Sequence, residues 1–101
     1  MMPDKLIGAL TIGQSPRPDL VDPLRRYLPD GCRIIEVGAL DGLTAGDIPP
    51  IGERVYPLTT RLRNGAPVMV EEAFLQPRLQ QALAHLENEG AVASILLLSL
   101  I

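Results

Sequence analysis

The sequence has 101 residues, of which 47% are hydrophobic and 3% aromatic, with a formal net charge of −3 and an isoelectric point near 5.0. A chain of this length fits one domain, and its acidic balance provides no basic face for nucleic acid. The single cysteine, Cys32, and the single histidine, His85, exclude an internal disulfide and a cysteine-rich metal cage. We therefore expect no metal site, no cofactor and no nucleic-acid partner.

The N-terminus and the apolar runs indicate where the protein resides. The first ten residues, MMPDKLIGAL, contain an acid as well as a lysine and only a short apolar run, unlike a signal peptide. No stretch approaches the roughly 18 consecutive apolar residues of a membrane-spanning helix. We therefore expect a cytoplasmic protein in a reduced compartment, with no membrane partner.

The first half of the chain predicts a strand, a helix and a second strand. The apolar run KLIGALTIG predicts a buried strand over residues 5–12, ended by Gly13. A helix is expected to begin within residues 18–23 and to end before Pro29, and a second strand is predicted at residues 32–38. The apolar face of this helix comprises Leu20, Val21, Leu24, Tyr27 and Leu28.

The second half predicts a hairpin, a helix and a last strand. One helical turn is expected after Thr44, and two short extended segments meet at Asn64-Gly65, a strong hairpin signal. The pattern QPRLQQALAHLENEG predicts a helix over residues 76–90. The almost wholly apolar residues 91–101 are typical of a central parallel strand covered on both faces. The stripe of the second helix comprises Leu75, Leu79, Ala82, Leu83 and Leu86.

This order of elements, β-α-β-β-β-α-β, predicts an α/β fold. The sheet is expected to be mostly parallel and flanked by helices, with the β-hairpin as an insertion. Residues 1–101 would form a single domain. Because such a domain normally continues from its most hydrophobic strand into a loop and another helix, we expect a truncated chain.

The segment GQSPR, residues 13–17, is the first candidate site. In a parallel sheet, ligands bind at the carboxyl ends of the strands. Gln14 and Ser15 offer hydrogen bonds, the following helix start offers backbone N–H groups, and Arg17 offers a planar fork for an anion. The alternative is that Ser15 caps the helix and Arg17 is a solvated charge. No phosphate-loop or dinucleotide motif supports nucleotide binding.

Two further segments combine polar groups at predicted strand ends. Glu36 and Asp41 could serve as an acid/base pair. The favoured interpretation is that Asp41 is a turn acid and that Glu36 forms a salt bridge. The stretch Thr59-Thr60-Arg61 could bind an anion, although alternation in a half-exposed hairpin produces the same pattern.

Three single residues complete the candidates. Ser99 would lie at the exit of the last strand, where a small serine bonded to backbone is the favoured alternative to catalysis. His85 lies at the edge of the second helix's stripe and is expected at the surface. Cys32 opens a strand and is expected to be a small buried hydrophobe.

In order, LTIGQSPRPD, EVGALDGL, YPLTTRLRNG, FLQPRLQ and LLL resemble the AroM family, from Leu10 to Leu98. That family is similar to the aspartate/glutamate and hydantoin racemases, which place the active site between two α/β halves. Those enzymes use two cysteines and no pyridoxal cofactor to exchange a proton next to a carboxylate. The resemblance implies the N-terminal half of a racemase-like protein that binds a small carboxylate-bearing molecule. The implied binding residues are Thr11, Gln14, Ser15, Arg17, Thr59, Thr60 and Arg61, with Ser99 at the catalytic position.

The chain departs from this family at its end. Relatives are about twice as long, and Ser99 stands where many of them have a cysteine. Serine is a far poorer proton acceptor than a thiol near neutral pH, so the two-cysteine mechanism is not supported and the sequence leaves catalysis open. Two alternatives to a binding half-site remain. The chain is a non-catalytic module that self-associates as a homo-oligomer, or a fragment without independent activity.

Overall fold

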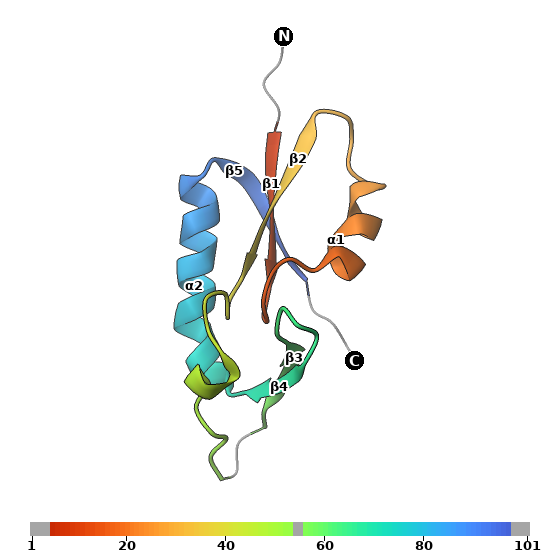
Figure 1. Ribbon diagram of the computed structural model, residues 1–101. Helices are drawn as coiled ribbons and strands as arrows, with labels where there is room; N and C mark the ends of the chain where they lie inside the picture. Colours follow the sequence, from red (N-terminus) through yellow and green to blue (C-terminus); the bar gives the residue numbers. More distant parts are fainter. Residues whose placement is uncertain (1–4, 54–55, 98–101) are drawn as a thin grey trace.

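The computed structural model describes residues 5–53 and 56–97 as an α/β fold. Strands β2, β1 and β5 form a parallel sheet in that order, and β3 and β4 form a separate antiparallel hairpin. Figure 1 shows α1 and α2 on opposite sides of the sheet, with the hairpin near the carboxyl ends of the strands. The predicted fold class is therefore confirmed. In chain order the elements are β1 (Lys5–Thr11), α1 (Pro18–Arg25), β2 (Cys32–Gly38), a 3-10 turn η1 (Ala45–Asp47), β3 (Leu58–Arg61), β4 (Pro67–Val70), α2 (Glu72–Asn88) and β5 (Ala91–Leu97).

The central strand of the described sheet is β1, not β5. Strand β1 pairs in parallel with both neighbours, and its small Gly8 lets Leu86 of α2 approach closely. The expectation of a central, doubly covered strand at residues 91–101 is wrong for β5, since Val92 and Leu96 are 66% and 50% exposed. An apolar run reports the hydrophobicity of a strand, and it does not report how many neighbours cover that strand.

Helix α2 begins at Glu72, four residues before the predicted start. Pro77 consequently lies inside the helix, although it lacks the N–H for one helical hydrogen bond. The side chain of Leu75 is fully buried in this first part of α2. Burial of Leu75 therefore explains why the helix begins at Glu72. The position of Pro77 had predicted a later start.

Helix α1 ends at Arg25, so its predicted apolar face is shorter than expected. Val21 is fully buried and Leu24 is half-buried, whereas Tyr27 is 85% exposed. Tyr27 lies beyond the last helical residue, so the helical spacing that predicted its burial does not apply to it.

Two apolar clusters hold the layers together. The first fills the space between the sheet and α2 and comprises Leu10, Ala82 and Leu86. The second lies at the carboxyl ends of the strands, where the hairpin, the start of α2 and the strand-end loops meet; it comprises Ile12, Ala39, Leu40, Val70 and Leu75. The strand-end loops are therefore packed on a core rather than extended into solvent.

Within residues 5–53 and 56–97, no helix has the length and apolar character needed to cross a membrane.

Candidate functional site

Gln14 clamps the loop after β1 to two other loops. Its Nε2 donates hydrogen bonds to the carbonyl oxygens of Leu40 and Leu43, at 2.8 and 2.6 Å. Its Oε1 accepts a 2.7 Å hydrogen bond from the backbone N–H of Arg63, and its own backbone N–H donates to the carbonyl of Arg61. The buried Gln14 amide thus joins the segment after β1 to the turn after β2 and to the hairpin.

Asp41 fixes the same loop from the turn after β2. Its Oδ1 accepts from the backbone N–H of Ser15, and its Oδ2 accepts from the Ser15 hydroxyl and the Gly38 N–H, all at 2.7–2.8 Å. Asp41 is therefore the turn acid that the sequence favoured. The interpretation of Ser15 as a helix cap is wrong, because Arg17 occupies the N-cap position and makes no side-chain cap.

Arg17 is buried and paired rather than solvated. Its Nε and Nη2 donate to the two carboxylate oxygens of Asp19, at 3.0 and 2.7 Å, and its backbone N–H donates to Glu36 at 3.0 Å. The hydrogen bond with Asp19 raises the pKa of Arg17 and lowers the pKa of Asp19 from its usual 3.8. Among the described residues Glu36 forms no ion pair, so the expected salt bridge of Glu36 is wrong.

A hollow of about 220 Å³ lies between the start of α1 and the hairpin. We call it the arginine hollow; residues 16–19, 61–63 and 65 line it. Its lining includes three arginines, Arg17, Arg61 and Arg63, and one acidic residue, Asp19. Arg63 also donates from Nε to the carbonyl oxygen of Ser15 at 3.0 Å. The structure thus brings Arg17 and Arg61 together, as a shared anion site requires.

The predicted threonines lie outside the lining of the arginine hollow. Thr59 is exposed and pairs with Met69 across the hairpin, whereas Thr60 is buried beside Gly13. Thr11 is 3% exposed, and its hydroxyl has no hydrogen-bond partner within the described part of the chain. The predicted catalytic Ser99 lies outside the described residues.

With this geometry established, comparison with known proteins identifies the family of the chain. The model of the AroM family, described as AroM protein, matches residues 7–99. The chain belongs to the AroM family. No curated protein and no solved structure matches it. The two AroM-like segments TIGQSPRPD and YPLTTRLRNG supply every residue that lines the arginine hollow.

Sequence reasoning missed two residues of this AroM chain that shape the site. Arg63 lines the hollow, and its spacing of two from Arg61, on either side of the buried Leu62, was a usable signal. Arg78 of α2 donates from Nε to the carbonyl oxygen of Ala39 at 2.6 Å and so anchors the turn after β2. Arg78 lies in FLQPRLQ, one of the segments that resemble the AroM family, and that segment was the signal that could have identified it.

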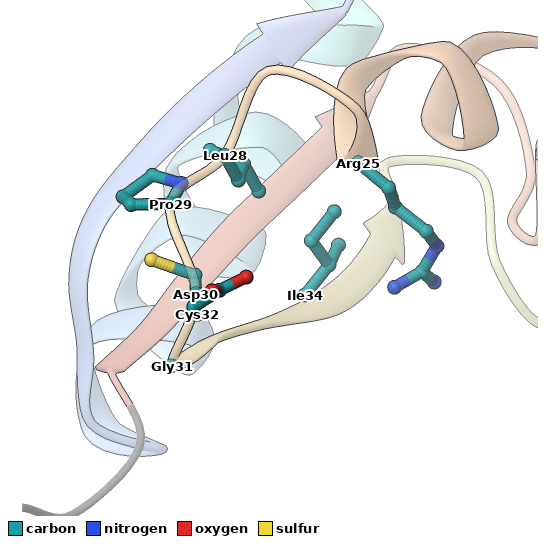
Figure 2. A pocket seen from close by; sticks show the side chains of 7 residues that line it. All are labelled: Arg25, Leu28, Pro29, Asp30, Gly31, Cys32 and Ile34. Atoms are coloured by element: carbon teal, nitrogen blue, oxygen red, sulfur yellow. The ribbon is translucent and has the colours of Figure 1, made fainter.

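A second hollow of about 280 Å³ lies at the opposite end of the AroM sheet, where α1 leads into β2. Figure 2 shows its lining, in which the guanidinium of Arg25 points away from the thiol of Cys32. Cys32 is half-buried and opens β2, and His85 is exposed on α2. Within the described ranges, no three His, Cys, Asp or Glu side chains lie close enough to hold a metal ion.

The chemistry of the arginine hollow suits binding. Guanidinium groups bind carboxylates through two parallel hydrogen bonds. Among the residues that line the hollow there is neither a thiol nor an imidazole, and its one carboxylate, Asp19, is already bonded to Arg17. The lining therefore combines side chains that are chemically able to bind an anion with no thiol or imidazole that could move a proton.

Proposed function

We propose that this AroM chain binds a small carboxylate-bearing molecule in the arginine hollow. The observation that carries the proposal is the meeting of Arg17, Arg61 and Arg63 around one hollow with Asp19 as the only acid in its lining. Within residues 5–53 and 56–97, neither Arg61 nor Arg63 forms an ion pair. Their charges are therefore available to an anion.

The position and size of the hollow support a small anionic ligand. The overall chain carries a net charge of −3, so this cluster of positive groups is a local feature and not an average of the surface. The hollow lies beside the start of α1, where the helix dipole favours negative charge. Its volume of about 220 Å³ is below the range of roughly 300–1,000 Å³ typical of drug-sized ligands.

The hydrogen bonds support different proposed roles for the predicted binding residues. Arg17, Arg61 and the additional Arg63 would contact the ligand. Gln14 and Ser15 would hold the loop, because their side chains already bond Leu40, Leu43 and Asp41.

The resemblance to racemases suggests a reaction in which this binding would take part. We propose that the chain contributes the carboxylate-binding half of a racemase-like site that needs no cofactor, in the cytoplasm. Cys32 is remote from the arginine hollow, at the amino end of β2, and would take no part in proton exchange.

Calorimetric titration of the full chain with L-glutamate and L-aspartate tests the proposal. Arg61→Ala and Arg63→Ala should each lower the affinity about tenfold, because each removes charge-assisted hydrogen bonds. Arg33→Ala is the matched control, because Arg33 is exposed near the amino end of β2, away from the arginine hollow. This substitution should leave the affinity unchanged. Absence of binding, or an equal loss with Arg33→Ala, would contradict the proposal.

A second candidate function, self-association of two copies, is favoured by β5. This strand lies at an edge of the described sheet and exposes Val92 and Leu96. Exposed apolar edge strands promote pairing between chains. Sedimentation at micromolar concentration should then show a dimer that Leu96→Lys dissociates and Met69→Lys, on the exposed face of the hairpin, does not. A wild-type monomer would rule out this function.

A further inference from the structure

The guanidinium of Arg17 already holds a carboxylate. Nε and Nη2 of Arg17 face Oδ1 and Oδ2 of Asp19 in the two-bond geometry with which arginine binds a free carboxylate. The partner is only two residues away and belongs to the first turn of α1. A carboxylate of the chain itself therefore occupies the hydrogen-bonding edge of the Arg17 guanidinium.

The two partners differ in how firmly they are held. The side chain of Arg17 is 8% exposed, and its backbone N–H is bonded to Glu36, whereas the side chain of Asp19 is 61% exposed. An exposed carboxylate that leaves its partner is solvated by water, so its departure costs little. Arg17 would stay in place while Asp19 turns away.

We propose that Asp19 occupies the position of the ligand's carboxylate and is displaced from Arg17 when the ligand binds. This inference rests on the proposed function and specifies its ligand class as a carboxylate that binds Arg17 through both oxygens. The exchange conserves charge at Arg17, because one carboxylate replaces another. The remainder of the ligand would then lie toward Arg61 and Arg63, on the facing side of the hollow.

Asp19 competes throughout the neutral pH range. The hydrogen bond from Arg17 lowers the pKa of Asp19 from its usual 3.8, so its side chain is charged near neutral pH. The competition is modest, since the Asp19 side chain is 61% exposed and water solvates it once it leaves Arg17. Removing the Asp19 charge should therefore raise ligand affinity about two- to fivefold.

Calorimetric titration of L-glutamate into the wild-type chain, Asp19→Asn and Asp22→Asn tests the exchange. Asp22 is the matched control, because it lies on the same helix and pairs weakly with Arg25 at 3.7 Å, outside the hollow. The proposal predicts a two- to fivefold gain for Asp19→Asn and none for Asp22→Asn. Thermal unfolding of both variants should show that each remains folded.

The outcomes separate the two proposals. Binding by the wild type that Asp19→Asn leaves unchanged or weakens would overturn the exchange and leave the proposed function standing. Absence of binding in all three proteins would overturn both. A parallel titration with inorganic phosphate distinguishes the ligand chemistry, because a gain for phosphate without one for L-glutamate would overturn the assignment to a carboxylate.

Discussion

Asp41 holds Ser15 by two hydrogen bonds, one from the backbone N–H and one from the hydroxyl, each 2.7 Å long. A third bond, from the N–H of Gly38, ties the same carboxylate to the end of β2. Because one side chain joins two strand ends, the loop that carries Arg17 is fixed before any ligand arrives. Preorganisation of this kind reduces the entropy lost on binding.

Replacement of Asp41 should loosen this loop. Asp41→Ala leaves three donors without their acceptor and should lower the free energy of unfolding by about 2–4 kcal/mol. Asp41→Asn keeps one acceptor oxygen and should cost less. Urea denaturation measures both, with the exposed loop residue variant Asp30→Asn as control. A change for Asp41→Ala no larger than that of the control would contradict the structural role.

The Gln14 amide offers a sharper test, because its two ends have opposite polarity. Gln14→Glu places a carboxylate oxygen against the carbonyl oxygens of Leu40 and Leu43, which now accept hydrogen bonds from Nε2. The substitution should cost about 2–4 kcal/mol of stability, more at neutral than at acidic pH, because protonation restores a donor. Equal stability of the variant and the wild type at neutral pH would show that the clamp is not formed.

Gly38 is required by a close approach of backbone and side-chain atoms. A Cβ at this position would lie 2.5 Å from the carbonyl oxygen of Gly13 and 2.6 Å from the backbone nitrogen of Ser15. Gly38→Ala should therefore destabilise the fold by about 3 kcal/mol and weaken anion binding. Gly46→Ala is the matched control, since its Cβ would have no neighbour nearer than 3.8 Å. Similar denaturation midpoints for the two variants would refute the close approach.

The pairing of Arg17 and Asp19 should be visible in the titration of Asp19. The hydrogen bond from Arg17 holds the pKa of Asp19 below its usual 3.8, so the pair stabilises the fold above about pH 4. This small contribution is lost as the pH falls through the lowered pKa. Arg17→Gln should return the pKa toward the usual value in an NMR titration of the side-chain carboxyl carbon. An identical pKa in both proteins would show that the pair does not form in solution.

Local pattern was sufficient to predict most of the elements. The run from Lys5, the turn at Asn64-Gly65 and the stripe from Leu79 to Leu86 each report their own segment, because they depend on neighbours in sequence. The position of β5 at an edge depends on which strands lie beside it. Periodicity carries no information on such neighbours.

The candidate site was predicted only in part, because a local sequence pattern does not report contacts between distant side chains. The rule for parallel sheets placed Arg17 after the carboxyl end of β1. Arg61 lies in the antiparallel hairpin, and the AroM resemblance grouped it with Arg17. The internal bonding of Gln14 and the pairing of Arg17 with Asp19 arise from contacts between side chains, and the sequence pattern does not fix these contacts. For Arg63 the sequence offered only its spacing of two from Arg61, and its place in the lining of the hollow depends on how the hairpin folds against the start of α1.

The most direct test is an NMR titration of the labelled chain with L-glutamate, following the side-chain Nε–Hε signals of its arginines and the backbone amides. A carboxylate site in the arginine hollow should shift the signals of Arg17, Arg61 and Arg63 and of the amides around residues 13–19 and 61–65, and it should leave Arg25 and Arg33 unchanged. Shifts confined to Arg25 and Arg33, or no shift at millimolar ligand, would contradict a carboxylate site in the arginine hollow.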